Sequence, residues 1–194
     1  MPGLADIELV ASTCTRCALA GGRTTVVFGE GDPHADLMVV GEGPGREEDL
    51  QGRPFVGRSG QLLDRLLVEE AGLRRDEVYI ANVVKCRPPG NRDPLPDEIA
   101  ACRPFLDQQV ALIGPRVLVT LGRFATHALL GTTEGIARLR GRTYPFGTDG
   151  AVLLPTYHPA AALRGGGEVV ARMRADFVRA RAALDAARVG TGER

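Results

Sequence analysis

The sequence contains no apolar stretch that is long enough to cross a membrane, which takes about 20 mostly apolar residues. The N-terminal segment "MPGLADIELVASTC" lacks the basic region and the apolar core of a signal peptide. We therefore expect a cytoplasmic protein with no membrane partner. In a reducing compartment, cysteines are more often metal ligands or buried thiols than disulfides.

Lysine is almost absent, because Lys85 is the only one among 24 basic residues. With 24 acidic residues the formal net charge is +0, so an anionic partner must be met by a local patch. Arginine suits bidentate phosphate contacts. A GC-rich coding sequence explains the same bias equally well.

The common nucleotide-binding motifs are also missing. The glycine-rich stretch "GEGPGREEDLQGRPFVGRSG", residues 41–60, has Arg46 where a dinucleotide fingerprint needs its third glycine, and Pro44 removes a backbone donor. No Gly-Lys-Ser/Thr follows. The stretch is either a tight turn without a ligand or, because glycine lets backbone approach a ligand closely, a narrow slot for a flat group beside Phe55.

Four short apolar runs predict buried strands. They are continuous instead of alternating, which is typical of strands that are covered on both faces. Helical patterns separate them, so the chain predicts a parallel sheet between layers of helices in one domain, residues 1–194. The expected strands are Leu37–Val40, Val78–Ala81, Val117–Leu121 and Val152–Pro155.

The helices are expected from their apolar stripes. Ser59 is the predicted N-cap of a helix whose one face carries Leu62, Leu63, Leu66 and Leu67. Residues 97–113 form another, which Pro104 must kink or divide. Residues 123–130 and 168–188 complete the set.

Polar groups follow the predicted strands. Ligands bind at the carboxyl ends of parallel strands, so these groups should converge on one site. The strand ends carry Gly41-Glu42-Gly43, Asn82, Gly122 and Thr156-Tyr157-His158. The other histidines, His34 and His127, are expected to be structural.

Four cysteines, Cys14, Cys17, Cys86 and Cys102, form a possible metal site. The first two have the Cys-x2-Cys spacing of a metal knuckle, and no histidine lies near any of the four. Four thiolates suit a tetrahedral zinc ion or a [4Fe–4S] cluster. Four unrelated buried thiols are the alternative.

Taken together, "GEGPGREEDLQGRPFVGRSGQLLD", "YIANVVKCRPPGNRDPLPDE", "YHPAAALR" and the four cysteines resemble the family 4 uracil-DNA glycosylases. The resemblance implies a three-layer α/β/α fold with a central four-stranded parallel sheet. It also implies a [4Fe–4S] cluster on the cysteines, and hydrolytic removal of uracil from single-stranded and double-stranded DNA by a monomer. The alternatives are a non-catalytic nucleic-acid-binding module with a structural metal, and a nucleotide-binding electron carrier.

The resemblance also suggests roles for the site residues. Phe55 would stack on the flipped base, unless it is a core residue, and Asn82 would read the uracil edge. His158 would stabilise the charge that develops on the base. The segment around Glu48 would exclude thymine. The expected uracil-binding residues are Glu42, Gly43, Glu48, Phe55, Asn82 and His158.

The water-activating group is expected among the carboxylates of the glycine-rich stretch. Gly43 stands where the best-known uracil glycosylases have an aspartate, so Glu42 is the expected catalytic carboxylate, together with His158. Glu47, Glu48 and Asp49 are its rivals.

DNA contacts are expected from basic residues in and beside the motifs. Relatives usually have a bulky apolar residue four positions after the motif histidine, where this chain has Ala162, so Leu163 or Arg164 would have to fill the hole left by the flipped base. A related covalent class has a histidine within residues 85–102 and this chain has none, which predicts true turnover. The expected DNA-binding residues are Arg58, Lys85, Arg87, Arg92, Leu163 and Arg164.

Overall fold

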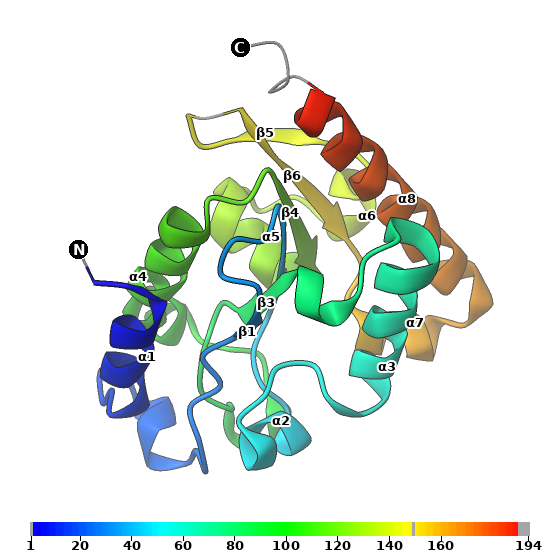
Figure 1. Cartoon of the computed structure of the whole chain (residues 1–194). Helices are drawn as coiled ribbons and strands as arrows, with labels where there is room; N and C mark the ends of the chain where they lie inside the picture. Colours follow the sequence, from blue (N-terminus) through cyan, green and yellow to red (C-terminus); the bar gives the residue numbers. More distant parts are fainter. Residues whose placement is uncertain (1, 149, 190–194) are drawn as a thin grey trace.

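A central sheet organises the computed structural model, which describes residues 2–148 and 150–189. The strand order is β1-β3-β2-β4-β6-β5 (Figure 1). The four inner strands are parallel, as predicted, and β1 and β5 are antiparallel additions at the two edges. The strands are β1 (Glu30–Gly31), β2 (Leu37–Gly41), β3 (Tyr79–Asn82), β4 (Val117–Leu121), β5 (Tyr144–Phe146) and β6 (Ala151–Thr156).

Helices cover both faces of the sheet (Figure 1). One layer contains α1 (Leu4–Ser12), α4 (Pro96–Ile113) and α5 (Arg123–Leu130), and the other contains α3 (Gly57–Leu66), α7 (Pro159–Gly165) and α8 (Gly167–Val189). The short helices are α2 (Arg46–Gln51), α6 (Ile136–Leu139), the 3-10 turns Ala18–Gly21, Arg75–Glu77 and Pro89–Asn91, and a π-turn, Leu67–Ala71. This is the three-layer α/β/α architecture that was expected.

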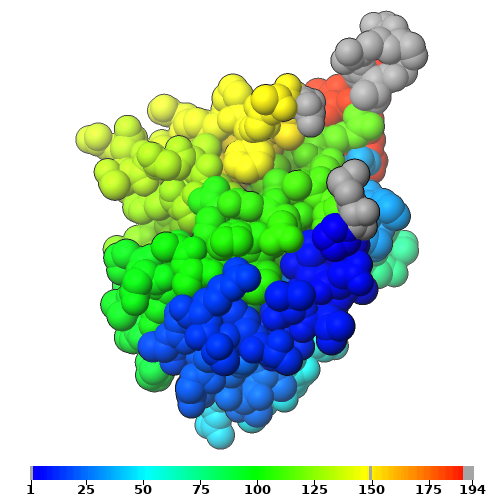
Figure 2. All heavy atoms as spheres, turned by 90° about the vertical axis from the view of Figure 1, so that its left-hand side faces the viewer, coloured from blue at the N-terminus to red at the C-terminus, as the bar shows by residue number. Residues whose placement is uncertain are grey.

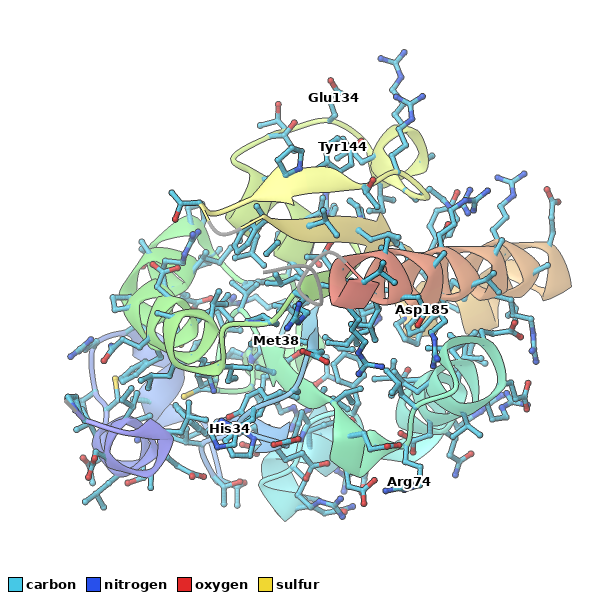
Figure 3. The ribbon with its side chains drawn as sticks, turned by 45° about the horizontal axis from the view of Figure 1, so that its top comes forward. His34, Met38, Arg74, Glu134, Tyr144 and Asp185 are labelled. Carbon is cyan, nitrogen blue, oxygen red and sulfur yellow. The ribbon has the colours of Figure 1, made fainter. Side chains whose placement is uncertain are left out.

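Strand β2 shows why its apolar run is continuous. The side chains of Leu37 and Val39 enter the core beneath α3 and α8, whereas those of Met38 and Val40 enter the core beneath α1 and α4. All four are buried. Figure 3 places Met38 in the interior, while Arg74 and Glu134 lie at the periphery. Successive side chains of a strand point to opposite faces, so a sheet buried on both sides needs no polar alternation.

One prediction about helices was wrong, because helix α3 begins at Gly57 with Val56 as its N-cap, so Ser59 lies inside the helix. Helix α4 runs as one element through Pro104, so no new helix begins there. The predicted leucine face of α3 is confirmed, because Leu62, Leu63, Leu66 and Leu67 are all buried. No helix in the described part of the chain has both the length and the apolar character to cross a bilayer.

Candidate active site

The carboxyl ends of the four parallel strands meet at a cavity of about 620 Å³. Gly41 at the end of β2 is in register with Asn82 at the end of β3, and Gly122 and His158 follow β4 and β6. The expected convergence is therefore confirmed. All six residues expected to bind uracil line this cavity: Glu42, Gly43, Glu48, Phe55, Asn82 and His158.

Asn82 is the most deeply buried polar side chain on the cavity, with 1% of its surface exposed. Its Oδ1 atom has no hydrogen-bond partner within the described residues. A buried, unpaired acceptor costs about 1–3 kcal/mol, so its presence here points to a ligand that supplies a donor.

Gly41 makes room for this amide. A Cβ at position 41 would lie 2.4 Å from Oδ1 of Asn82 and 2.4 Å from Cζ of Phe55. Any side chain at this position would displace both residues. The absence of a side chain at the end of β2 therefore lets the Asn82 amide and the Phe55 ring lie close to the backbone of Gly41.

Phe55 has an unusual backbone. Its φ of 49° is uncommon for a residue with a side chain, and its carbonyl oxygen would be 1.9 Å from a Cβ at Gly60. The ring is 6% exposed and lies 5.8 Å from the ring of His158, with 35° between the planes. The two rings therefore form one wall of the cavity, and Phe55 also belongs to the core beneath α3.

His158 is the N-cap of α7, and Pro159 occupies the first helical position, where a missing N–H costs nothing. The backbone N–H of Ala160 donates to Nδ1 of His158 at 3.2 Å. Nδ1 is therefore an acceptor, and the neutral ring carries its proton on Nε2. Burial, with a smaller effect from Arg164, lowers the pKa of His158 to about 4. The ring is thus a neutral donor at pH 7.

Glu42 is the carboxylate with the most altered acidity at the site. Burial and, to a smaller extent, the negative charge of Asp93 raise its pKa to about 7, although Arg123 acts in the opposite direction. A carboxyl group whose pKa is close to the working pH can exchange a proton during a reaction.

The rival carboxylates are engaged elsewhere. Asp49 is buried and accepts hydrogen bonds from the backbone of Thr24, and Glu47 is exposed and does not line the cavity. Glu48 lines it, but its two oxygens accept from the backbone N–H groups of Gly45 (3.1 Å) and Val56 (3.0 Å). Glu48 thus ties the two glycine-rich turns together.

Asp93, Arg123 and Phe124 also line the cavity and were not among the predicted site residues. Arg123 forms an ion pair with Asp93 at 2.5 Å, and its guanidinium lies 4.5 Å from the ring centroid of Phe124. Arg123 and Phe124 directly follow Gly122 at the end of β4, so their position in the sequence could have identified them as residues of the site. The contact of Asp93, in a loop 30 residues away, had no signal in the sequence.

The four arginines expected to bind DNA are divided among three environments. Arg92 and Arg164 line the cavity, although Arg92 also pairs with Glu98 through two hydrogen bonds. Arg58 is exposed outside it. Arg87 is partly buried and donates to Asn91.

The prediction that Lys85 binds DNA was wrong. Its side chain is 1% exposed, because it is enclosed between β3 and α4. Leu163 is partly buried against the core beneath α3 and α8, and Ala162 is fully buried there. Arg164 is exposed and lines the cavity, whereas Leu163 does not line it.

The four cysteines line a second, smaller cavity, together with Arg16, Arg23 and Lys85. The N-terminal segment that carries Cys14 and Cys17 lies against the surface that includes α4 (Figure 2). Sγ of Cys86 accepts from Arg23 at 3.5 Å, and Sγ of Cys102 accepts from the backbone N–H of Lys85 at 3.2 Å. Within residues 2–148 and 150–189, no three Cys, His, Asp or Glu side chains are placed to hold a single metal ion.

Comparison with known proteins gives a consistent result. A family model described as the uracil DNA glycosylase superfamily matches residues 28–185. The chain is 47% identical over 169 residues to a Type-4 uracil-DNA glycosylase of Sulfurisphaera tokodaii, covering 84% of this chain and 77% of that protein. It is 46% identical over 167 residues to one of Saccharolobus solfataricus (81% and 77% covered) and 50% identical over 152 residues to one of Thermotoga maritima (78% and 78% covered).

Proposed function

Because the chain belongs to the uracil DNA glycosylase superfamily, we propose that it removes uracil from DNA by hydrolysing the N-glycosidic bond, leaving an abasic site for repair. The observation that carries the proposal is the unpaired Oδ1 of Asn82 at the base of the cavity. A base within a duplex is out of reach, so the uracil must be turned out into this cavity.

Asn82 can select uracil through its amide. Its Oδ1 accepts the N3–H of uracil, and its Nδ2 donates to O4. Cytosine has an acceptor at N3 and a donor at C4, so it would leave buried polar groups unpaired, which is the strongest form of discrimination. Phe55 stacks on the base and contributes about 1–3 kcal/mol without regard to its identity. Gly43 lines the cavity where a Cβ would lie 2.6 Å from Val84. The segment around Glu48 opposes the methyl group of thymine.

His158 and Glu42 act on opposite sides of the bond that is cleaved, His158 on the uracil and Glu42 on the sugar. The departing uracil gains negative charge, and the neutral His158 ring donates from Nε2 to its O2 atom. A fixed donor of this kind favours the transition state over the ground state. Glu42 accepts a proton from the attacking water and stabilises the cationic sugar, for which its raised pKa is suited.

We propose that Cys14, Cys17, Cys86 and Cys102 hold a structural [4Fe–4S] cluster. Lys85 and two arginines, Arg16 and Arg23, line the same cavity. The Lys85 amine contacts two neutral oxygens, and negatively charged thiolates would balance it. Four thiolates without a histidine are a ligand set that suits such a cluster. When bound, the cluster would hold the N-terminal segment against α4. The four cysteines must stay reduced to bind it, which is consistent with a location in the cytoplasm.

The DNA would run across the cavity rim. Arg123, Arg92, Arg87 and Arg58 would contact its phosphates, and the exposed Arg164 would fill the hole left by the uracil. Each phosphate contact makes binding weaker at higher salt. The substrate can be single-stranded, where turning out costs least, or double-stranded, and one domain acts as a monomer.

The test is release of free uracil from an oligonucleotide that contains one uracil, with cytosine, thymine, hypoxanthine and xanthine as competing substrates. We expect uracil release with multiple turnovers, and a Cys86→Ser variant that loses visible absorbance. A protein that binds the oligonucleotide but releases no base would be a binding module, which contradicts the proposal. A colourless protein that contains zinc would contradict the cluster.

A further inference from the structure

Lys85 joins the cysteine cavity to the amino acid that selects the base. Its backbone N–H donates to Sγ of Cys102, and its Nζ donates to the backbone oxygen of Asn82 at 2.8 Å. Lysine is almost never fully buried, yet Lys85 is one of the largest fully buried side chains of this protein. One residue thus contacts both sites.

Further hydrogen bonds hold Lys85 in place, and we call Lys85, Cys102 and Gln109 together the frame. Gln109, fully buried on α4, accepts from Nζ of Lys85 at 2.5 Å and donates to the carbonyl of Phe28 and to the hydroxyl of Tyr79. Because Cys102 and Gln109 both lie on α4, that helix holds Lys85 at its backbone and at its amine.

The chain after Asn82 depends on the same frame. The carbonyl of Asn82, the last residue of β3, accepts a hydrogen bond from Nζ of Lys85. The amides of Val83 and Val84 then donate to Gly41 and Glu42. A change at Lys85 would therefore move the Asn82 amide relative to Glu42.

We propose that Lys85 is a positioning residue that couples the four-cysteine site to Asn82, so that the selectivity for uracil depends on the integrity of the cysteine site. This inference rests on the proposed function. It gives the buried lysine a role that neither DNA binding nor core packing supplies.

The test compares Lys85→Met with Ile113→Ala, which alters a buried residue at the end of the same helix α4 but outside the frame. Losing a donor to a buried carbonyl should reduce the preference for uracil over cytosine by about tenfold. It should also speed hydrogen exchange at Val83 and Val84 by about tenfold relative to other protected amides. Ile113→Ala should lower the melting temperature and leave both ratios unchanged.

A second measurement covers the case in which Lys85→Met does not fold. Gln109→Leu keeps the bond from Lys85 to Asn82 and loosens its support, so we expect the same two changes in smaller amount. Coupling between the cysteine site and the uracil site is reciprocal. An uncleavable 2′-fluorouridine oligonucleotide should therefore alter the visible circular dichroism of the wild-type holoprotein and not that of Gln109→Leu. Unchanged selectivity and exchange in both variants would overturn the proposal. If the wild type releases no uracil, the proposed function fails, while the exchange data still decide the positioning role.

Discussion

The backbone N–H of Ala160 donates to Nδ1 of His158, and this single bond fixes which nitrogen of the ring faces the cavity as a donor. A protonated ring would have no acceptor for that N–H. Burial acts in the same direction, since it lowers the pKa of the ring to about 4. The structure therefore holds His158 in the neutral form that donates from Nε2.

The protonation of His158 can be observed directly. We expect nitrogen-15 chemical shifts typical of the Nε2–H tautomer, and no titration of this ring between about pH 5 and pH 8. Its folded pKa is below the ordinary value of 6.5. Between those two values the unfolded chain binds more protons, so the contribution of this group to stability is lost as the pH falls from 6.5 toward 4. A ring that titrates near 6.5 would contradict this assignment.

The pH dependence of activity should follow Glu42. If its carboxylate is the active form, kcat/KM should rise as the pH passes through about 7, the pKa of Glu42. Asp93→Asn removes a negative neighbour and should move the midpoint to lower pH, whereas Arg123→Gln removes a positive one and should move it to higher pH.

Each of these midpoints should shift by about half a unit to one unit. The opposite directions of the paired variants separate an electrostatic effect from damage to the fold. Glu42→Gln should abolish the rise of kcat/KM with pH altogether. If the rise persists in Glu42→Gln, another group must be responsible for it.

Gly41 provides a steric test of the site. Gly41→Ala places a Cβ 2.4 Å from Asn82 and from Phe55, so we expect a loss of activity of more than about a hundredfold, measured as single-turnover uracil release. Gly135→Ala is the matched control, since a Cβ there meets nothing within 4 Å and its φ is −64°. Equal activity of the two variants would show that uracil release does not depend on the present positions of the Asn82 amide and the Phe55 ring.

Glu48 can be tested by removing one acceptor. Glu48→Gln keeps one oxygen but directs an NH2 group at the backbone N–H of Gly45 or Val56, so the two turns should separate slightly. We expect a loss of about 1–3 kcal/mol in the free energy of unfolding and a rise in KM, with a smaller change in kcat. Kinetics on a uracil oligonucleotide and thermal unfolding check both. Thymine release by this variant would support its role in exclusion, and an unaltered stability would show that the two bonds are weak.

The sheet and the site were largely predictable, because strands buried on both faces leave continuous apolar runs such as Leu37–Val40, and the ends of parallel strands must meet. The short edge strands β1 and β5 were not, since two or three residues carry no periodicity. Lys85 was misplaced because a lysine beside a motif suggests a surface cation; its burial depends on Gln109, which is 24 residues away. Contacts between distant loops, such as Arg123 with Asp93, have no local pattern.

The antiparallel strands β1 and β5 also affect how this protein behaves in a crowded solution. A long, unpaired parallel edge is a template on which another chain can build a ladder and begin to aggregate. Here each side of the sheet finishes in a strand of only two or three residues. Edge strands this short give an incoming strand very few backbone groups to pair with, which protects the open sheet from growing by edge-to-edge pairing.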